Sequence, residues 1–509
     1  MRTRKPAFLA LDGGTSAGRA ALFDAEGRLL AQAVRPWDYE APADAAPWGR
    51  EFAPGRFWDL LCDAARAVCG AAKAGETYQV AGIAATAQRQ ATILLDAAGQ
   101  ELYAGPNIDL RGAFEGLRML SERGPRIHAV TGHLPPLMFA AARWLWFCEH
   151  RPDVCARAVH LLMMPDWLTW HLCGEMATGA SIAAESGLFD VARRVWSEEQ
   201  AEGAGIPLSI LPPVLSAGDK AGELLPAAAE ALGLEQGIPV IVAGTDVGCG
   251  LLAMDVTHPG QAGLVAGWSA PAQLVTDSPV FDLSRSLWTT CSVAGAPWVL
   301  EGNAGPAGSA HRWALDMLTP GGAFEEFEVL AEHAPPGSGA SLALLGPRIA
   351  DYADPQLLWG GFLFPQANDM LTCGRAELAR AVLENIAFAV KANLLRMQSC
   401  AALGGHDFSQ TLRLGGGLAT SALFAQILVD VLGTPVEVAA VPSVSAHGAA
   451  VCAAAGTGFY ADILEAAQCM RQAGPERLPR PAAQAEYLDA YERWVQAYEV
   501  LSGLSRTLG

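Results

Sequence analysis

Two aspartates that each follow a short apolar run are the residues of this chain best suited to chemistry. Asp12 follows residues 7–11 and opens the turn Asp12-Gly13-Gly14-Thr15, and Asp246 follows residues 238–242 through Ala243-Gly244-Thr245. An aspartate carboxylate binds Mg²⁺ or takes a proton from a hydroxyl. Glycines beside it let the backbone approach a ligand closely. The combination is typical of phosphoryl transfer.

Other side chains near these turns extend the pattern. Thr15 and the amides of residues 13–16 form a donor-rich turn suited to phosphate oxygens. Arg19 can neutralise negative charge on a transferring group, and Asp12 is a candidate ligand for a metal ion or its water. A third glycine turn, Gly415-Gly416-Gly417-Leu418-Ala419, follows another apolar run. A plain hairpin turn is the alternative interpretation of Gly13 and Gly14.

The elements that must position these turns are predicted from periodicity. Residues 7–11 and 20–24 predict two strands around the first turn, and residues 263–275 repeat this strand-turn-strand shape. Other patterns predict a strand at 80–84 and helices at 57–68 and 377–397. The aromatic stripe Tyr487, Tyr491, Trp494 and Tyr498 predicts a helix that docks on the body of the protein. Residues 475–479, which contain two prolines, predict a surface loop.

Composition limits the class of protein. A chain of 509 residues is expected to form about two to four domain-sized units. Hydrophobic residues make up 51% and charged residues 17%, which fits a globular enzyme, and the net charge of −19 argues against nucleic acid. No apolar run approaches the roughly 20 residues that cross a membrane. Eleven cysteines without a C-x-x-C pair indicate reduced thiols, so we expect a cytoplasmic protein.

The three glycine turns, in this order and spacing, resemble those of the FGGY carbohydrate kinases. Residues 164–168, 185–190, 377–388 and 425–433 support the resemblance, which covers nearly the whole chain. It implies an α/β fold with two actin-like (ribonuclease-H-like) ATPase domains flanking a central cleft. The N-terminal domain, residues 1–256, would bind sugar and phosphate. The C-terminal domain, residues 257–509, would bind the adenine nucleotide.

The resemblance also implies ATP and Mg²⁺ as cofactors and a role for each matching residue. Asp246 would be the catalytic base, with a helix-capping aspartate as the alternative, and Asp12 would hold the metal. The implied ATP- and phosphate-binding residues are Gly13, Gly14, Thr15, Arg19, Gly267, Ser269, Gly416, Gly417 and Ala419. The implied substrate-binding residues are Gln88, Arg89, Gln90, Asp109 and Asp246. For Asp109, an ion pair with Arg111 or Arg89 is the alternative.

The resemblance implies phosphorylation of a hydroxyl of a small sugar, with a ketopentose such as D-xylulose as the first candidate. Arg89-Gln90 matches neither the Gln-Arg-Glu of glycerol kinases nor the Gln-Met-His of xylulokinases, whereas residues 107–111 and Asp246-Val247 resemble autoinducer-sugar kinases. Glycerol, a tetrulose or an autoinducer-type sugar are alternative substrates. A catalytically weak sugar-binding pseudokinase is the alternative of another class. The expected partner is a small sugar, without nucleic acid or membrane, and a second copy of the chain would make a homodimer.

Four features depart from the family pattern. Ser443 stands where a glutamate often starts the late helix, and Gly346-Pro347-Arg348 is a reduced form of the usual Glu-Arg-x-Pro segment. Trp268 stands where a threonine is usual in the second phosphate turn, and Leu418 stands where a third glycine is usual. An indole has one donor and no acceptor, so Trp268 cannot replace a threonine hydroxyl.

Overall fold

The computed structural model describes residues 4–74, 78–355, 358–367, 370–371, 373–406 and 411–508. The chain divides into two compact units. The first comprises Met1–His258, Asp277–Val299 and Ser443–Gln472, and the second comprises Pro259–Thr276, Leu300–Pro442 and Ala473–Gly509. Each unit is therefore built from segments that lie far apart in the sequence.

A six-stranded mixed sheet organises the first unit, with the strand order β12-β13-β4-β1-β2-β3. β13 and β4 are parallel, as are β4 and β1, while β2 runs antiparallel to both β1 and β3. Its strands are β1 Lys5–Gly13, β2 Ala17–Asp24, β3 Leu29–Pro36, β4 Tyr78–Ala87, β12 Lys220–Glu223 and β13 Pro239–Val242. The strands predicted at 7–11, 20–24 and 80–84 are thus confirmed.

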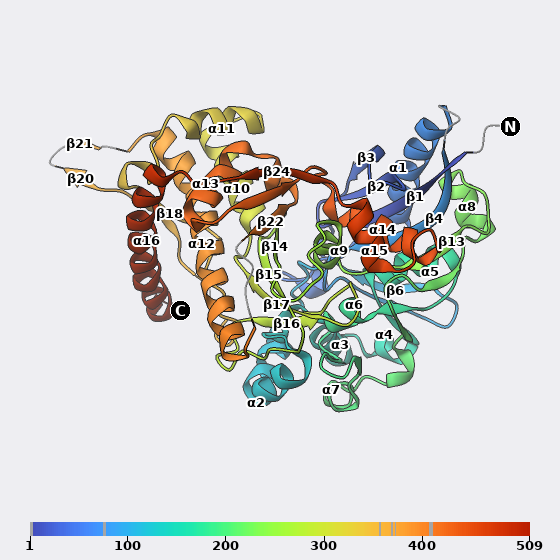
Figure 1. The fold of residues 1–509 in the computed structure, drawn as a ribbon. Helices are drawn as coiled ribbons and strands as arrows, with labels where there is room; N and C mark the ends of the chain where they lie inside the picture. Colours follow the sequence, from blue (N-terminus) through green and yellow to red (C-terminus); the bar gives the residue numbers. More distant parts are fainter. Residues whose placement is uncertain are drawn as a thin grey trace. The chain divides into compact units, whose positions relative to one another are not determined.

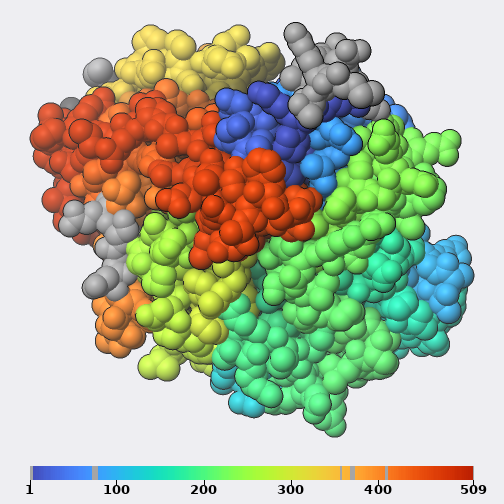
Figure 2. All heavy atoms as spheres, turned by 45° about the vertical axis from the view of Figure 1, so that its right-hand side comes forward, coloured from blue at the N-terminus to red at the C-terminus, as the bar shows by residue number. Residues whose placement is uncertain are grey.

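Both faces of this sheet are covered, which explains why its central strands are continuously apolar. On one face, Leu9 and Leu11 of β1 belong to the same core as Phe57 and Leu61 of α1 (Pro54–Ala74). On the other face lies α14 (Val444–Gly456), from the C-terminal part of the chain, and its His447 stacks on Phe23 of β2. Figures 1 and 2 both show this red-orange segment against the blue N-terminal strands.

Among the remaining elements of the first unit, helix α9 begins with the candidate residue Asp246, and the candidates Gln90 and Asp109 lie in the loops before β5 and after β6 of the small sheet β6-β5-β7. Its other strands are β5 Thr92–Leu95, β6 Glu101–Gly105, β7 His160–Met163, β8 Thr178–Gly179, β9 Phe189–Asp190, β10 Val195–Trp196, β11 Val214–Leu215 and β16 Trp288–Cys291. Its other helices are α2 Ala113–Thr131, α3 Ala140–His150, α4 Pro152–Arg157, α5 Met164–Cys173, α6 Ala180–Ala184, α7 Glu198–Gly203, α8 Pro226–Leu232, α9 Asp246–Ala253 and α15 Ile463–Met470.

The second unit contains the strand run β17-β15-β14-β22-β23-β24. Its strands are β14 Ala262–Val265, β15 Pro271–Thr276, β17 Trp298–Asn303 (which belongs to this unit from Leu300 on), β18 Leu342–Leu344, β19 Gly361–Leu363, β20 Gln366–Ala367, β21 Met370–Leu371, β22 Leu412–Gly415, β23 Val436–Ala439 and β24 Ala473–Arg477. Its helices are α10 Ala307–Leu318, α11 Phe324–Glu332, α12 Arg375–Leu403, α13 Ala422–Leu432 and α16 Pro481–Leu508. The predicted helix at 377–397 lies within α12.

The C-terminal part of the second unit confirms one prediction and corrects another. Tyr487 and Trp494 of α16 are fully buried, and Nε1 of Trp494 donates to Oδ1 of Asn385, so the aromatic stripe docks as predicted. The loop predicted at 475–479 is wrong in its first part, because β24 extends to Arg477 and pairs antiparallel with β23. β24 ends the strand run, where proline is tolerated because one side of the strand needs no donor.

Among the described residues, no helix combines the length and apolar character that crossing a bilayer requires.

Candidate active site

The turn between β1 and β2 places the first group of candidate residues at the end of two strands. Asp12 and Arg19 are opposite each other in the hairpin, and Nη1 of Arg19 donates to Oδ2 of Asp12 over 2.7 Å. Burial raises the pKa of Asp12, and the charge of Arg19 opposes that shift. A Cβ on Gly13 would lie 2.8 Å from Cε of Met164, so a larger residue here would require the Met164 side chain to move.

Thr15 is held by residues that the sequence patterns did not connect with it. Nδ2 of Asn107 donates to its hydroxyl over 3.0 Å, and the hydroxyl of Tyr39 donates to its carbonyl. Gln88 joins these partners, because its Nε2 donates to the Tyr39 hydroxyl and its Oε1 accepts from the amide of Asn107. Gln88, which was predicted to bind substrate, therefore stabilises the turn of residues 12–15 through Tyr39 and Asn107.

Asp246 begins α9 at the end of the connection from β13. Thr245 caps this helix by accepting from the amide of Gly248 over 3.2 Å, and Oδ1 of Asp246 accepts from the amide of Val247. Asp246 therefore lies on a helix terminus, and the residue is half-buried. A fixed but accessible carboxylate of this kind can reach a bound molecule.

The electrostatic environment of Asp246 links it to the first turn. Burial is the main cause that raises the pKa of Asp246 to about 7, the positive charge of Arg89 lowers it, and the negative charges of Asp12 and Glu185 raise it. Asp12, Arg89 and Asp246 thus belong to one charged neighbourhood within the first unit. A carboxyl group that titrates near neutral pH is suited to accept a proton in a reaction.

Arg89 and Gln90 share one buried acceptor, Glu185, which the sequence analysis did not select as a site residue. Nη1 of Arg89 lies 3.4 Å from Oε1 of Glu185, and Nε2 of Gln90 donates to Oε2. The guanidinium of Arg89 also lies 5.6 Å from the ring centroid of Trp288. Gln90 has a φ of 60°, a strained value for a residue other than glycine, and such strain concentrates at functional sites.

Glu185 is stabilised as a carboxylate despite its burial. Burial is the largest single influence and raises its pKa, but Arg89, His133 and Gln90 together bring the pKa down to about 2. Nε2 of His133 lies 3.7 Å from Oε1 of Glu185, and Nδ1 lies 2.6 Å from the carbonyl of Thr131. In the sequence, the one feature that could have marked Glu185 as a site residue is that it is a single acidic residue among the small residues of 183–187.

Asp109 has its carboxylate occupied by protein donors. Oδ1 accepts from the amide of Arg50 over 2.8 Å, and Oδ2 accepts from Nε of Arg111 over 2.8 Å and from the hydroxyl of Tyr103. Asp109 is fully buried. These contacts favour the ion pair with Arg111 over direct contact with a sugar. Arg143 reinforces the same loop by donating to the carbonyls of Asp109 and Gln90.

The two turns predicted to bind ATP, at residues 267–269 and 415–419, lie side by side in the second unit. β14 and β22 are parallel neighbours, and Val265 is opposite Gly415. The amide of Ala266 donates to the Gly415 carbonyl over 2.8 Å, and the amide of Leu418 donates to the Ala266 carbonyl over 3.0 Å. The candidate nucleotide-binding residues on these two turns are Gly267, Ser269, Gly416, Gly417 and Ala419.

Two glycines, one in these turns and one that packs on them, are required by close contacts with the backbone. Gly416 has a φ of +93°, and a Cβ on it would lie 2.5 Å from the carbonyl oxygen of Ala266. A Cβ on Gly308, at the start of α10, would lie 2.5 Å from the carbonyl oxygen of Gly267. Trp268 is not buried in the turn, because 47% of the residue is exposed.

Comparisons with known proteins identify the family of the chain. Residues 7–253 match the N-terminal domain of the FGGY family of carbohydrate kinases, and residues 265–457 match its C-terminal domain. The chain belongs to the FGGY family of carbohydrate kinases. FGGY kinases have two actin-like domains, so the predicted α/β fold is confirmed.

Among curated FGGY kinases, the chain is 30% identical to the autoinducer-2 kinase of Salmonella typhimurium strain LT2, over 97% of this chain and 94% of that one. It is 29% identical to the autoinducer-2 kinase of Escherichia coli strain K12, over 98% and 95%. Among solved structures, the xylulose kinase of Rhodospirillum rubrum is 25% identical, with a TM-score of 0.83 and coverage of 98% and 100%. The glycerol kinase of Plasmodium falciparum with ADP is 20% identical, with a TM-score of 0.81 and coverage of 97% and 98%.

Proposed function

We propose that this FGGY kinase transfers the γ-phosphoryl group of ATP to a hydroxyl of a small sugar or sugar-like compound. The observation that carries the proposal is Asp246, a half-buried aspartate at the start of α9 whose pKa is raised to about 7. In this role the Asp246 carboxylate accepts the proton of the acceptor hydroxyl as that oxygen bonds to the γ-phosphorus and the bond to the β-phosphate oxygen breaks.

The residues of the first turn fit a phosphate and its metal ion. Nε of Arg19 is buried without a hydrogen-bond partner among the described residues, as is Oδ1 of Asn107. Arg19 can donate to a phosphate oxygen, and Asp12 is placed to hold Mg²⁺ or one of its waters. Bound Mg²⁺ supplies positive charge that neutralises the transferring group. Because the negative charge of Asp12 raises the pKa of Asp246, a cation there would favour the ionised base.

The Arg89–Gln90–Glu185 group is our candidate for sugar recognition. Glu185 fixes both donors, and Trp288 provides an aromatic face beside Arg89. A guanidinium and an amide held in this way can donate to sugar hydroxyls with little loss of side-chain freedom.

We propose autoinducer-2 as the first substrate to test and a ketopentose such as D-xylulose as the second. The first choice rests on 30% identity to autoinducer-2 kinases over 97% of the chain, and the second on the fold of the xylulose kinases. A coupled assay of ADP release with both compounds, other pentuloses, tetruloses and glycerol tests the proposal. ATP-dependent ADP release with one compound supports it. No release with any of them, together with saturable binding of one, supports a sugar-binding pseudokinase instead.

A further inference from the structure

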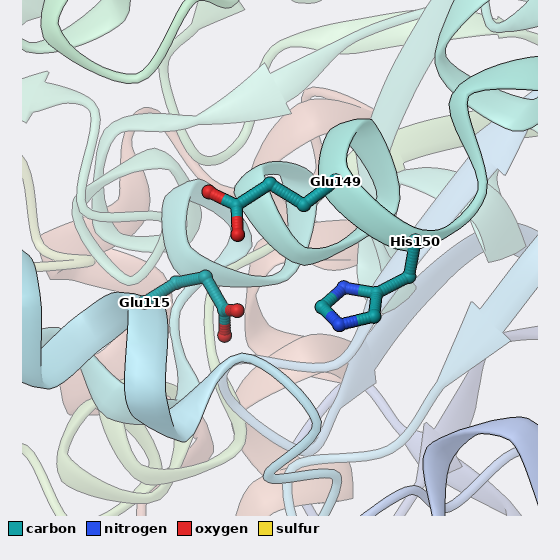
Figure 3. Close-up of side chains that lie close together, drawn as sticks. All are labelled: Glu115, Glu149 and His150. Atoms are coloured by element: carbon teal, nitrogen blue, oxygen red, sulfur yellow. The ribbon is translucent and has the colours of Figure 1, made fainter.

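A group of three possible metal ligands lies on helices α2 and α3 of the first unit. Glu115 is in the first turn of α2, and Glu149 and His150 are the last two residues of α3. One ligand atom from each side chain lies within 4.8 Å of the other two, and among the described residues this is the one such group. Figure 3 shows the two carboxylates and the imidazole facing a common space.

Glu115 points to a ligand in this space. Only 5% of the residue is exposed, and its Oε2 is buried without a hydrogen-bond partner in the described part of the chain. An unpartnered buried carboxylate oxygen is costly, because it loses its water without a replacement. A cation bound between α2 and α3 would satisfy that oxygen.

His150 is oriented as metal-ligating histidines are. Its Nδ1 lies 3.0 Å from the carbonyl oxygen of Trp146, and the ring stacks on the Trp146 indole with centroids 4.8 Å apart. Since a carbonyl only accepts, the geometry assigns the proton to Nδ1 and leaves the lone pair on Nε2. A backbone acceptor behind the ring is the usual partner of a histidine that binds metal through its other nitrogen.

Glu149 is exposed, so its side chain can change conformation. Arg118 of α2 forms an ion pair with its Oε1, which leaves Oε2 available. The two carboxylates carry more negative charge than Arg118 offsets. Zinc ligands lie about 2.0–2.2 Å from the metal, so Glu149 and His150 need to move inward slightly, as their exposed position permits.

We propose that Glu115, Glu149 and His150 bind a divalent transition-metal cation, with Zn²⁺ as the probe. One nitrogen and two carboxylate oxygens suit Zn²⁺, whereas Mg²⁺ prefers six oxygen ligands and retains its waters. The site differs from the Mg²⁺ position proposed at Asp12 and does not depend on the proposed function. Its cation links α2 to α3, the helix that carries Arg143.

The test is titration of the full-length chain with Zn²⁺ by isothermal calorimetry, with Mg²⁺ in every buffer. All versions carry Ser at Cys148 and Cys155, because their sulfur atoms lie 2.7 Å apart and thiolates bind zinc. The variants are Glu115→Gln and His150→Ala. The matched control is His333→Ala, since His333 also follows a glutamate at a helix end, with Nδ1 2.6 Å from the Val329 carbonyl.

We expect one Zn²⁺ per parent chain, an affinity at least about tenfold weaker in Glu115→Gln and His150→Ala, and no change in His333→Ala. At the same Zn²⁺ concentration, the Tm of the parent should rise more than that of His150→Ala. Absence of Zn²⁺ binding by the parent overturns the proposal. Unchanged affinity in both variants, or an equal loss in His333→Ala, overturns it as well. Because His150 is exposed, its variant keeps the test valid even if Glu115→Gln fails to fold.

Discussion

Asp12 and Arg19 are direct cross-strand partners in the β1–β2 hairpin, and their side chains form a 2.7 Å ion pair. The pairing holds the guanidinium at the turn while 31% of the Arg19 side chain stays exposed. Nε of Arg19 has no partner among the described residues. The arginine is thus fixed by one carboxylate and still has a donor for an incoming phosphate.

Replacement of Arg19 should therefore impair the use of ATP. We expect Arg19→Ala to raise the KM for ATP or lower kcat by about 10- to 100-fold, the equivalent of one charge-assisted hydrogen bond. Arg19→Lys should retain part of the activity, since it keeps the charge but loses the planar fork. Steady-state kinetics with varied ATP make the measurement. An alanine variant with wild-type kinetics would remove Arg19 from the phosphate site.

Asp246→Asn tests the assignment of the base. The amide keeps the size of the side chain and removes its basicity, so kcat should fall on the order of 10²–10⁴-fold. Because the base must be ionised, wild-type kcat/KM should decline as the pH falls through about 7, and the residual activity of the variant should lack this step. ATP binding, measured by calorimetry, serves as the control and should change little. Full activity in the variant would exclude Asp246 as the base.

The same substitution should stabilise the fold at high pH. Asp246 has a folded-state pKa of about 7, above its ordinary value of 3.8. The stability that the protonated Asp246 side chain contributes to the fold is therefore complete below pH 3.8 and is lost as the pH rises through 7. Asn carries no charge at any pH, so Asp246→Asn should raise Tm relative to wild type at pH 8 and less so at pH 5. An equal shift in Tm at both values would contradict the raised pKa.

Glu185→Gln should show the opposite dependence on pH. The folded-state pKa of Glu185 is about 2, below its ordinary 4.5. The stability it provides, on the order of 3 kcal/mol, is present above pH 4.5 and is lost as the pH falls toward 2. In urea unfolding, the advantage of wild type over the variant should shrink across that window. A constant difference in the free energy of unfolding would count against the prediction. The KM for sugar should rise, because Arg89 and Gln90 lose their shared acceptor.

Trp268→Thr restores the residue that is usual in the second phosphate turn. Since 47% of Trp268 is exposed, its loss should cost little stability, and we expect kcat to stay within a few-fold of wild type or to rise. Calorimetric Tm and the ADP-release assay make the measurement. If the wild type is inactive with every sugar and the variant gains activity, the indole blocks the γ-phosphate position. If the wild type is active and the variant is not, the indole itself is essential.

Local patterns predicted the elements that carry the candidate site. Short-range spacing sufficed for the strands at 7–11 and 80–84 and for the helix within α12, because each depends on which nearby side chains are buried. The glycine at 416 marked a turn where a Cβ would collide with the backbone of Ala266. This turn and the one that follows β1 place Asp12 at a strand end and the candidate nucleotide-binding residues side by side on two parallel strands.

Contacts between distant segments could not be predicted in this way. Gln90 donates a hydrogen bond to Glu185, which lies 95 positions later in the sequence. Nothing in the local sequence around either residue indicates this pairing. The alternatives for Asp109 stayed open because its interaction with Arg111 depends on how the loop is buried. A pKa of about 7 for Asp246 likewise depends on Arg89, Asp12 and Glu185, which come from separate segments.

Helix α14 comes late in the sequence but covers the N-terminal sheet, and this order affects folding during synthesis. Phe8 of β1 and Phe23 of β2 pack against Phe459 and His447 from the segment Ser443–Gln472. A ribosome therefore releases the first strand long before it makes the helix that covers one face of that strand. Until then this apolar sheet face is open to misassociation. Nascent chains stalled before residue 443 should accordingly bind chaperones that recognise apolar strands, and release should follow synthesis of α14.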